Sequence, residues 1–177
     1  MKYDVFISYS RRDYIDNAGN IIPGNVVSKI LALFEEYKKH YNFEYFFDQD
    51  AIMSQHEYLK RISTAIADSR VMLFIASENS YASEFCSKEL LFADKRRVHI
   101  HQYCIDDAIM PDDIDMLLGT HQYRKLRSCS EETIVSEVLS DALAKQIMPI
   151  REFKAIEVAN NNNEKSSKRY KVGDYYD

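Results

Sequence analysis

One carboxylate in this chain falls on the apolar side of a predicted helix, and its position needs a chemical explanation. The helix begins near residue 85, and one of its faces repeats apolar residues at spacings of three and four: Phe85, Cys86, Leu90 and Ala93. Glu89 lies among them rather than on the opposite, charged face. Because burying an unpaired carboxylate costs free energy, such a glutamate normally has a partner or a function. Glu89 is therefore the first candidate for a functional residue.

Two structural alternatives stay open around this residue. Glu89 can form an ion pair with Arg11, Arg12 or a nearby lysine, because ion-pair networks also hold carboxylates in partly buried positions. Cys86 has the side chain of a nucleophile, yet the sequence shows no constellation of histidine and asparagine beside it. We therefore expect Cys86 to be a small core residue.

His99 and His101 are the residues that could bind a metal ion. They are two positions apart in a predicted strand, so both imidazoles lie on the same face. A metal site needs at least one more ligand, and the sequence shows none nearby. We expect both histidines to pack against the rest of the domain or to face solvent, and we predict no metal site.

Composition and charge narrow the classes of partner. The 177 residues are 46% hydrophobic and 29% charged, which is typical of one globular domain with a real core. The formal net charge is −5, so neither nucleic acid nor a membrane surface is an expected partner. The three cysteines form no CxxC pair, and the most apolar run, residues 71–76, is too short to span a bilayer. These features favour a cytoplasmic protein.

Short apolar runs alternate with helical periods along the chain. Strands are predicted at residues 3–8, 43–47, 71–77, 98–105 and 121–126. Helical patterns begin near residues 26, 55, 85 and 130, and residues 110–118 are expected to form a short helix or a turn. The first helical pattern has the apolar stripe Val26, Ile30, Leu33 and Tyr37. The alternation predicts an α/β fold, a flavodoxin-like three-layer sandwich whose five-stranded parallel sheet of order 2-1-3-4-5 carries helices on both faces.

Three loops are expected to meet at one edge of this sheet. Ligands of such sheets bind outside the carboxyl ends of the strands. This rule places residues 9–12, 48–55 and 77–89 around one crevice. Within the second loop, Ser54 and Glu57 form a capping-box pattern that begins the following helix.

The C-terminal part differs in character. From residue 148 the periodicity fades, and residues 160–168 read as a polar linker. Residues 169–176 resemble the opening strand and turn of a new unit. We expect residues 148–177 to be an extension that leads to a downstream module of a longer protein, and a plain disordered terminus is the alternative.

Two segments resemble the signature boxes of Toll/interleukin-1 receptor (TIR) domains. Residues 3–10 (YDVFISYS) resemble the first box, and residues 83–90 (SEFCSKEL) resemble the family's Ser-x-Trp-Cys-x-x-Glu-Leu signature. The resemblance covers residues 1–147, which are expected to form the TIR domain. Phe85 stands where the family usually has tryptophan.

The loop after the second strand resembles the family's BB loop. Phe47 and Asp48 stand in the place of the second box, and residues 48–57 correspond to the loop. Ser54 lies near the position where many BB loops carry glycine. The resemblance implies that this loop mediates self-association with other TIR domains and that the isolated domain is weakly active until it oligomerises.

The resemblance also implies an enzyme of the bacterial, NAD-cleaving type. Many bacterial TIR domains cleave the nicotinamide–ribose bond of NAD⁺, and Glu89 takes the position of their catalytic glutamate. The implied activity is that of an NAD⁺ nucleosidase (NAD⁺ glycohydrolase), which gives nicotinamide plus ADP-ribose or a cyclic ADP-ribose isomer in anti-phage immune signalling. NAD⁺ is the substrate, and no cofactor is expected. The implied substrate-binding residues are Tyr9, Ser10, Arg11, Asp48 and Phe85.

One carboxylate is sufficient for this reaction. Nicotinamide leaves as a neutral ring from a positively charged one, so the leaving group needs no proton from a general acid, unlike an ordinary sugar leaving group. What remains is to stabilise an oxocarbenium-like ribose, which a poorly solvated carboxylate does by its charge. A cation such as Arg11 suits the pyrophosphate, and the Phe85 ring suits stacking.

Other function classes are weighed against this one. A non-catalytic module for TIR–TIR interaction in signal transduction is the alternative. A receiver domain would need a phospho-accepting aspartate at the end of the third strand, where the chain has Ser77 and Glu78. No GxGxxG segment or P-loop is present, which excludes the usual dehydrogenase and nucleotide triphosphatase motifs.

Overall fold

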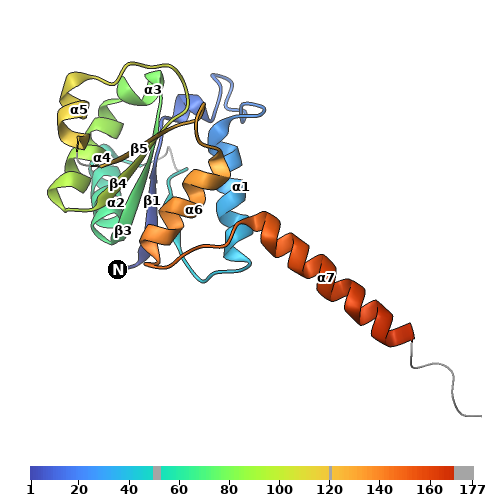
Figure 1. The fold of residues 1–177 in the computed structure, drawn as a ribbon. Coiled ribbons are helices and arrows are strands. Elements are labelled where there is room, and N and C mark those ends of the chain that lie inside the picture. The colour runs from blue at the N-terminus through green and yellow to red at the C-terminus, as the bar shows by residue number, and fades with distance from the viewer. Residues whose placement is uncertain (50–52, 120, 170–177) are drawn as a thin grey trace, which may run out of the picture. The chain divides into compact units, whose positions relative to one another are not determined.

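Strands and helices alternate along the chain (Figure 1). The computed structural model describes residues 1–49, 53–119 and 121–169. The strands are β1 (Tyr3–Ser8), β2 (Tyr45–Phe47), β3 (Ser69–Ala76), β4 (His99–Cys104) and β5 (Gln122–Lys125). The helices are α1 (Val26–Lys38), α2 (Gln55–Ala67), α3 (Glu78–Tyr81), α4 (Glu84–Lys95), α5 (Asp112–Leu118), α6 (Glu131–Ala142) and α7 (Ile150–Arg169), with a 3₁₀ turn, η1 (Arg11–Asp13).

The strands form one parallel sheet of order β2-β1-β3-β4-β5. In its register, Val5 of β1 pairs with Tyr45 on one side and with Val71 on the other. The predicted flavodoxin-like fold and its strand order are therefore confirmed. Because β1, β2 and β3 are neighbours, the loops that follow their carboxyl ends meet at the same edge.

Helices cover both faces of the sheet (Figure 1). Helices α1 and α6 pack together over one face, and α2, α4 and α5 cover the other. The core on the second face includes fully buried residues from the sheet and from both long helices: Phe6, Ile66, Met72, Leu90 and Ile100. The predicted apolar side of α4 thus packs on the sheet, which sets the direction of Glu89.

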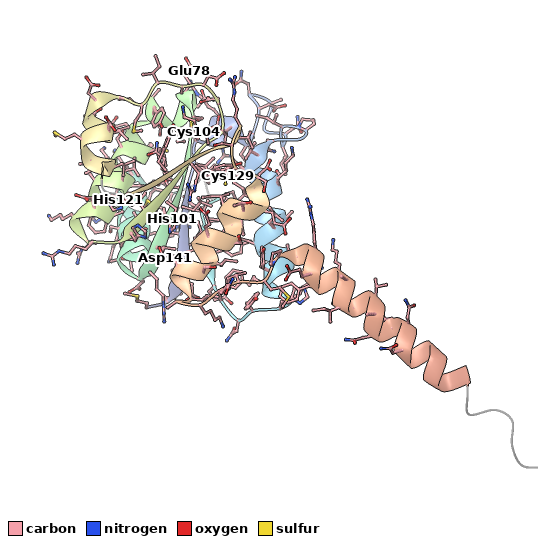
Figure 2. All side chains as sticks on the ribbon, viewed as in Figure 1. Glu78, His101, Cys104, His121, Cys129 and Asp141 are labelled. Atoms are coloured by element: carbon pink, nitrogen blue, oxygen red, sulfur yellow. The ribbon has the colours of Figure 1, made fainter. Side chains whose placement is uncertain are left out.

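The core also contains two of the three cysteines. Cys86 and Cys104 are buried and Cys129 is half-buried, and all three are free thiols (Figure 2 labels Cys104 and Cys129). The expectation that Cys86 is a small core residue agrees with its 2% exposure.

The apolar stripe predicted for helix α1 is wrong at two of its four residues, each by one position. Its buried residues are Val27, Ile30, Phe34 and Tyr37. Val26 and Leu33, which the periodicity favoured, are only half-buried. Adjacent apolar pairs leave the helical period ambiguous, and the packing of α1 against α6 decides between them.

Strand β2 is shorter than predicted, because it begins at Tyr45 instead of residue 43. The Asp4 carboxylate accepts a 2.9 Å hydrogen bond from the backbone N–H of Glu44. A side chain thus replaces the regular ladder partner just before the strand.

The chain divides into two compact units, Met1–Ile147 and Met148–Asp177. In the second unit, α7 runs through residues 160–168, which the sequence suggested as a linker. The predicted strand and turn at 169–176 lie almost wholly outside the described residues. None of the described helices combines the length and the hydropathy that a membrane span requires.

Candidate functional site

Helix α4 places Glu89 beside the carboxyl end of β1. Ser83 caps the helix, its Oγ accepting a hydrogen bond from the backbone N–H of Cys86 at 3.3 Å. Cys86 and Leu90 are buried in the core, whereas Glu89 is half-buried. The Oε2 atom of Glu89 accepts a 2.5 Å hydrogen bond from the hydroxyl of Ser8, the last residue of β1. The strand end therefore fixes the carboxylate in position.

The surroundings of Glu89 favour its neutral form. Burial raises the pKa of Glu89 to about 7, although the hydrogen bond from Ser8 acts in the opposite direction. Burial, followed by the charge of Glu89, also raises the pKa of Cys86 to about 12. Cys86 is therefore a thiol at neutral pH, which disfavours a role as nucleophile.

Among the residues that the structure describes, no basic side chain forms an ion pair with Glu89. Arg11 and Arg12, the partners considered from the sequence, are both exposed. Lys88 lies one position before Glu89, but it pairs with Glu84 at 2.9 Å. The ion-pair alternative for Glu89 thus finds no support in the described geometry.

Two cavities flank Glu89. The first, here called the strand-end cavity, has a volume of about 460 Å³ and lies where β1 and β2 end. Polar and aromatic side chains from four segments line it, among them Tyr9, Arg11, Asp48, Tyr58, Phe85 and Glu89. Its volume falls in the range that small-molecule sites occupy.

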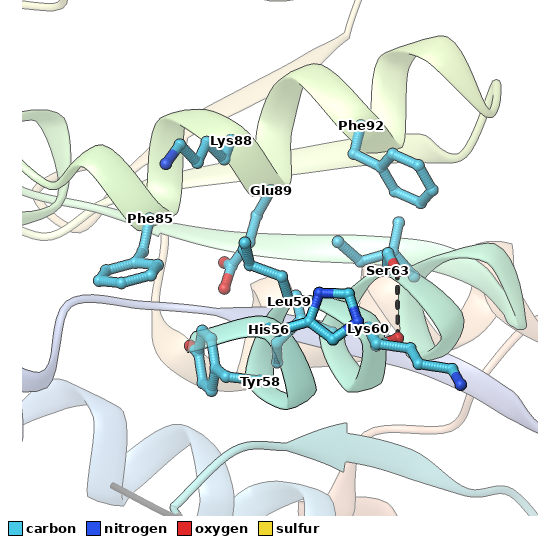
Figure 3. Close-up of a pocket in the computed structure, with 11 residues that line it drawn as sticks. His56, Tyr58, Leu59, Lys60, Ser63, Phe85, Lys88, Glu89 and Phe92 are labelled. Carbon is cyan, nitrogen blue, oxygen red and sulfur yellow. Dashed lines mark hydrogen bonds between the residues drawn. The ribbon is translucent and has the colours of Figure 1, made fainter. Parts of the chain in front are cut away.

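The second, here called the interhelical cavity, lies between α2 and α4 and has a volume of about 420 Å³. Glu89 and Phe85 extend into it from α4 towards Tyr58 on α2 (Figure 3). Tyr58, Phe85 and Glu89 line both cavities. A ligand longer than one ring can therefore reach both sides of the carboxylate.

Aromatic rings form much of the wall around Glu89. Phe85 is 44% exposed, and its ring meets the Tyr58 ring edge to face at 5.3 Å. On the other side of the strand-end cavity, Tyr9 stacks on Phe47 with ring centroids 4.5 Å apart. These rings offer apolar faces for a planar ligand.

The 3₁₀ turn η1 brings Arg11 to the strand-end cavity, and Asp13 anchors the turn. Asp13 Oδ2 accepts a hydrogen bond from the hydroxyl of Ser77, which follows β3. Asp13 Oδ1 accepts a second one from the side-chain amide of Asn79, at 2.8 Å. The turn after β1 is thus tied to the end of its neighbour β3.

Asp48 lies where β2 ends, and its groups are engaged within the domain. Its carboxylate forms an ion pair with Arg61 of α2. Its backbone carbonyl accepts a 2.6 Å hydrogen bond from the Tyr9 hydroxyl. Burial raises the pKa of Tyr9 well above its usual value, so this hydroxyl stays a neutral donor.

The structure brings four of the five expected substrate-binding residues to the strand-end cavity together with Glu89: Tyr9, Arg11, Asp48 and Phe85. Ser10 differs from the expectation. It is 6% exposed and lines neither of the two cavities, because the chain turns there from β1 into η1.

Sequence reasoning missed two residues of the site. Ser8 had a usable signal, since it ends the first strand at the edge where ligands bind. Tyr58 reaches Phe85 only because α2 and α4 are adjacent in space, and no local pattern shows this contact.

The expected self-association loop, residues 48–57, is described in part. Residues 50–52 lie outside the described residues. The predicted capping box is confirmed, because the Ser54 hydroxyl accepts from the Glu57 N–H and the Glu57 carboxylate accepts from the Ser54 N–H. Ser54 thus caps the N-terminus of α2.

In the described part of the chain, the one group of three or more side chains that could hold a metal ion lies away from this site. It consists of His99, His101 and Asp141.

Comparisons with solved structures find TIR domains. One is a metazoan TIR-STING receptor from C. gigas in complex with 2′,3′-cGAMP, with a TM-score of 0.52, 16% identity and 83% of this chain covered. This chain spans 41% of that receptor's chain. Another is the TIR domains of the activated Roq1 resistosome, which directly recognises the pathogen effector XopQ. It has a TM-score of 0.51 and 19% identity, and it covers 78% of this chain and 98% of that one.

At these identities the likeness to solved structures shows the fold alone. No curated protein sequence matches the chain. The family model described as "TIR domain" matches residues 5–139, well over half of the chain. Its span begins within β1, includes β2 to β5, and contains the signature box of residues 83–90 that carries Glu89. The chain therefore belongs to the TIR-domain family.

Proposed function

We propose that this TIR domain is an NAD⁺ glycohydrolase that cleaves the nicotinamide–ribose bond. The observation that carries the proposal is the state of Glu89, a half-buried carboxyl group held by Ser8, flanked by two cavities and without a described basic partner. Such a carboxylate is available to a positively charged ligand. Its effect on that charge is strengthened because the surroundings are poorly solvated.

The bond changes balance without a general acid. The C1′–N bond breaks, its electron pair neutralises the nicotinamide ring, and positive charge develops on the ribose. In the hydrolase, water then attacks C1′ and releases its proton to solvent, giving ADP-ribose. In the cyclase, a nucleophilic atom of the same ADP-ribose unit attacks C1′, releases any proton that it carries to solvent, and gives a cyclic isomer.

In the proposed reaction, Glu89 acts in its ionised form, as a carboxylate. In the free protein its pKa of about 7 means that both forms are present near neutral pH. A bound nicotinamide ring carries positive charge, which favours the ionised form of a nearby carboxyl group. Ionised Glu89 then opposes the charge that develops on the ribose.

The remaining residues of the site have separate proposed roles. Arg11 supplies a cation for the pyrophosphate, and the exposed Phe85 ring, backed by Tyr58, supplies a stacking face. Tyr9 closes the strand-end cavity on the opposite side. We assign Asp48 to positioning, because its carboxylate already pairs with Arg61.

We infer that this activity depends on self-association through the loop of residues 48–57. The support is the resemblance of that loop to the BB loop. We also infer an intracellular, cytoplasmic role in bacterial anti-phage signalling. NAD⁺ as substrate supports the location, and the resemblance to bacterial NAD-cleaving TIR domains supports the context.

The proposal is tested by separating the products of NAD⁺ chromatographically. Wild-type protein at high concentration should release nicotinamide, and Glu89→Gln should release none. Glu84→Gln is the matched control, because Glu84 lies on the same helix and its side chain is exposed. The second product distinguishes hydrolase from cyclase. Absence of nicotinamide from assembled wild-type protein would instead favour a non-catalytic interaction module.

A further inference from the structure

Strand β4 carries two histidines on the face that α6 covers. His99 and His101 are two residues apart, so their side chains project from the same face of the strand. The sequence showed no third ligand near them. The structure supplies one, because Asp141 in the last turn of α6 lies against both rings (Figure 2 labels His101 and Asp141).

The three side chains converge on one point. His99 Nδ1 lies 2.5 Å from Asp141 Oδ2, and His101 Nε2 lies 2.7 Å from the same oxygen. One potential ligand atom from each residue can be chosen such that all three are within 4.8 Å of one another. In a tetrahedral zinc site with bonds of about 2.0–2.1 Å, neighbouring ligand atoms are about 3.3 Å apart. To reach that geometry, each histidine nitrogen needs to move away from Asp141 Oδ2 by less than about 1 Å, and the largest separation within the group, up to 4.8 Å, needs to shrink towards the same value.

The burial of the three residues suits such an adjustment. His101 is 1% exposed and fixed in the domain, whereas the side chains of His99 and Asp141 are 44% and 38% exposed. The two exposed side chains can rotate around an ion while His101 remains in place. Their exposure also provides a path for the ion and room for water as a further ligand.

We propose that His99, His101 and Asp141 bind one divalent transition-metal ion of the zinc class, with solvent completing the coordination. Two imidazoles and a carboxylate are a ligand set that suits zinc. Magnesium and calcium prefer sites built from oxygen atoms, so they fit this cluster poorly.

One detail of His101 sets the expected strength of binding. Its Nδ1 atom has no hydrogen-bond partner among the described residues, although metal-binding histidines usually donate this second N–H to an acceptor. We therefore expect a micromolar rather than a nanomolar dissociation constant.

Neighbouring His121 is engaged in other interactions. Its Nδ1 accepts a 3.1 Å hydrogen bond from the backbone N–H of Ile100, and its Nε2 lies 3.6 Å from an oxygen of Asp94. His121 thus supports the edge of the cluster, with its ring centroid 5.7 Å from that of His99, and is not assigned as a ligand.

The proposed metal site is separate from Glu89. His99 begins β4 and therefore lies at the amino edge of the sheet, whereas Ser8 and Glu89 meet at the carboxyl edge. The cluster lies under α6, and Glu89 extends from α4 on the other face. A bound ion would join β4 to α6 and stabilise the domain, whether or not the domain cleaves NAD⁺.

The test uses untagged, metal-free full-length chain, titrated with Zn²⁺ by calorimetry and followed by thermal unfolding. We expect one Zn²⁺ per chain, a rise in Tm on saturation, and the visible absorption of a tetrahedral complex when Co²⁺ is used. His99→Gln and Asp141→Asn should each weaken Zn²⁺ binding by about tenfold or more. Both alter partly exposed positions, so circular dichroism should show an intact fold.

His40→Gln is the matched control, since it removes a histidine from outside the cluster. It should leave the Zn²⁺ affinity unchanged, and Mg²⁺ should not compete. The proposal is overturned if the wild type binds no stoichiometric Zn²⁺, or if both cluster variants bind it as tightly as the wild type does.

Discussion

At the scale of a single residue, Glu89 combines a raised pKa with a hydrogen bond that favours its ionised form. Its raised pKa of about 7 follows from burial on α4, and the Ser8 hydroxyl limits this rise by donating a hydrogen bond. A structural carboxylate would more commonly be held ionised by a basic neighbour, whereas Glu89 remains responsive to pH and to a cationic ligand. Its protonation state should therefore be visible in both activity and stability.

The pH dependence of NAD⁺ cleavage is the first prediction. The proposed mechanism requires the carboxylate form of Glu89, so it predicts that kcat/KM rises with pH and levels off above a midpoint of about 7. Ser8→Ala should move this midpoint to higher pH, since the hydrogen bond from Ser8 favours the ionised form. Initial rates across the pH range measure both. A flat profile, or one that falls as pH rises through neutrality, would contradict the assignment.

Stability gives a second prediction that does not depend on turnover. Unfolded Glu89 ionises near 4.5 and the folded residue near 7, so the wild-type free energy of unfolding falls as pH rises between these values. Glu89→Gln removes this penalty. At about pH 8 the variant should be more stable than the wild type by up to about 3 kcal/mol, and the gain should vanish below about pH 4.5.

Urea unfolding at several pH values measures this difference. Glu84→Gln is the control. Its pKa shift has the opposite sign to that of Glu89, because Lys88 lowers the pKa of Glu84. That substitution removes a favourable charge, so it should not stabilise the domain at high pH. A loss of stability in Glu89→Gln at about pH 8 would show that ionised Glu89 has a stabilising partner.

At the scale of elements, the site depends on how the loops after β1, β2 and β3 are tied together. The turn η1 carries Arg11, and Asp13 connects this turn to Ser77 and Asn79. These contacts link residues more than sixty positions apart in the chain. The position of Arg11 is therefore set by long-range hydrogen bonds and not by the turn alone.

Asp13→Ala should weaken substrate binding more than it changes turnover. Losing hydrogen bonds worth about 1 kcal/mol in net terms should raise KM for NAD⁺ about fivefold, with a smaller change in kcat. Steady-state kinetics measures the two constants. Asp16→Ala is the matched control, because Asp16 lies in the following loop and its carboxylate accepts hydrogen bonds from Ala18 and Asn20 of that same loop. Equal effects of the two substitutions would exclude a specific role for the Asp13 anchor.

Local patterns predicted most of the sheet and the helix that carries Glu89. Strand 3–8 and the capping box before α2 were correct because each depends on residues that are close in the sequence. The stripe of α1 shifted because two adjacent apolar pairs fit the same period. The contact of His99 with Asp141 joins residues 42 positions apart, and no pattern in the sequence links them.

At the scale of the whole molecule, the fold keeps the side chains of the two proposed sites apart. Glu89 lies at the carboxyl edge of the parallel sheet, and the cluster of His99, His101 and Asp141 lies towards its amino edge. Edges of one rigid sheet can bear independent sites, so the metal proposal and the NAD⁺ proposal can fail separately. The assignment to the TIR-domain family and the strand order do not depend on either proposal.

Self-association should control activity at this scale. If a neighbouring protomer completes the site through residues 48–57, specific NAD⁺-cleaving activity should increase with protein concentration. Light scattering and rate measurements on the same samples test this. Met53→Ala, in the described part of that loop and at the strand-end cavity, should reduce assembly and activity together. Full specific activity in a dilute and demonstrably monomeric sample would contradict the dependence.

The most direct measurement is NAD⁺ binding and cleavage by Glu89→Gln in the assembled state, beside Glu84→Gln and the wild type. Because Glu89 is assigned to the charge that develops on the ribose, the variant should still bind NAD⁺ but release no nicotinamide. Glu84→Gln should do both, like the wild type. Nicotinamide release by Glu89→Gln at the wild-type rate would show that this carboxylate does not perform the chemistry.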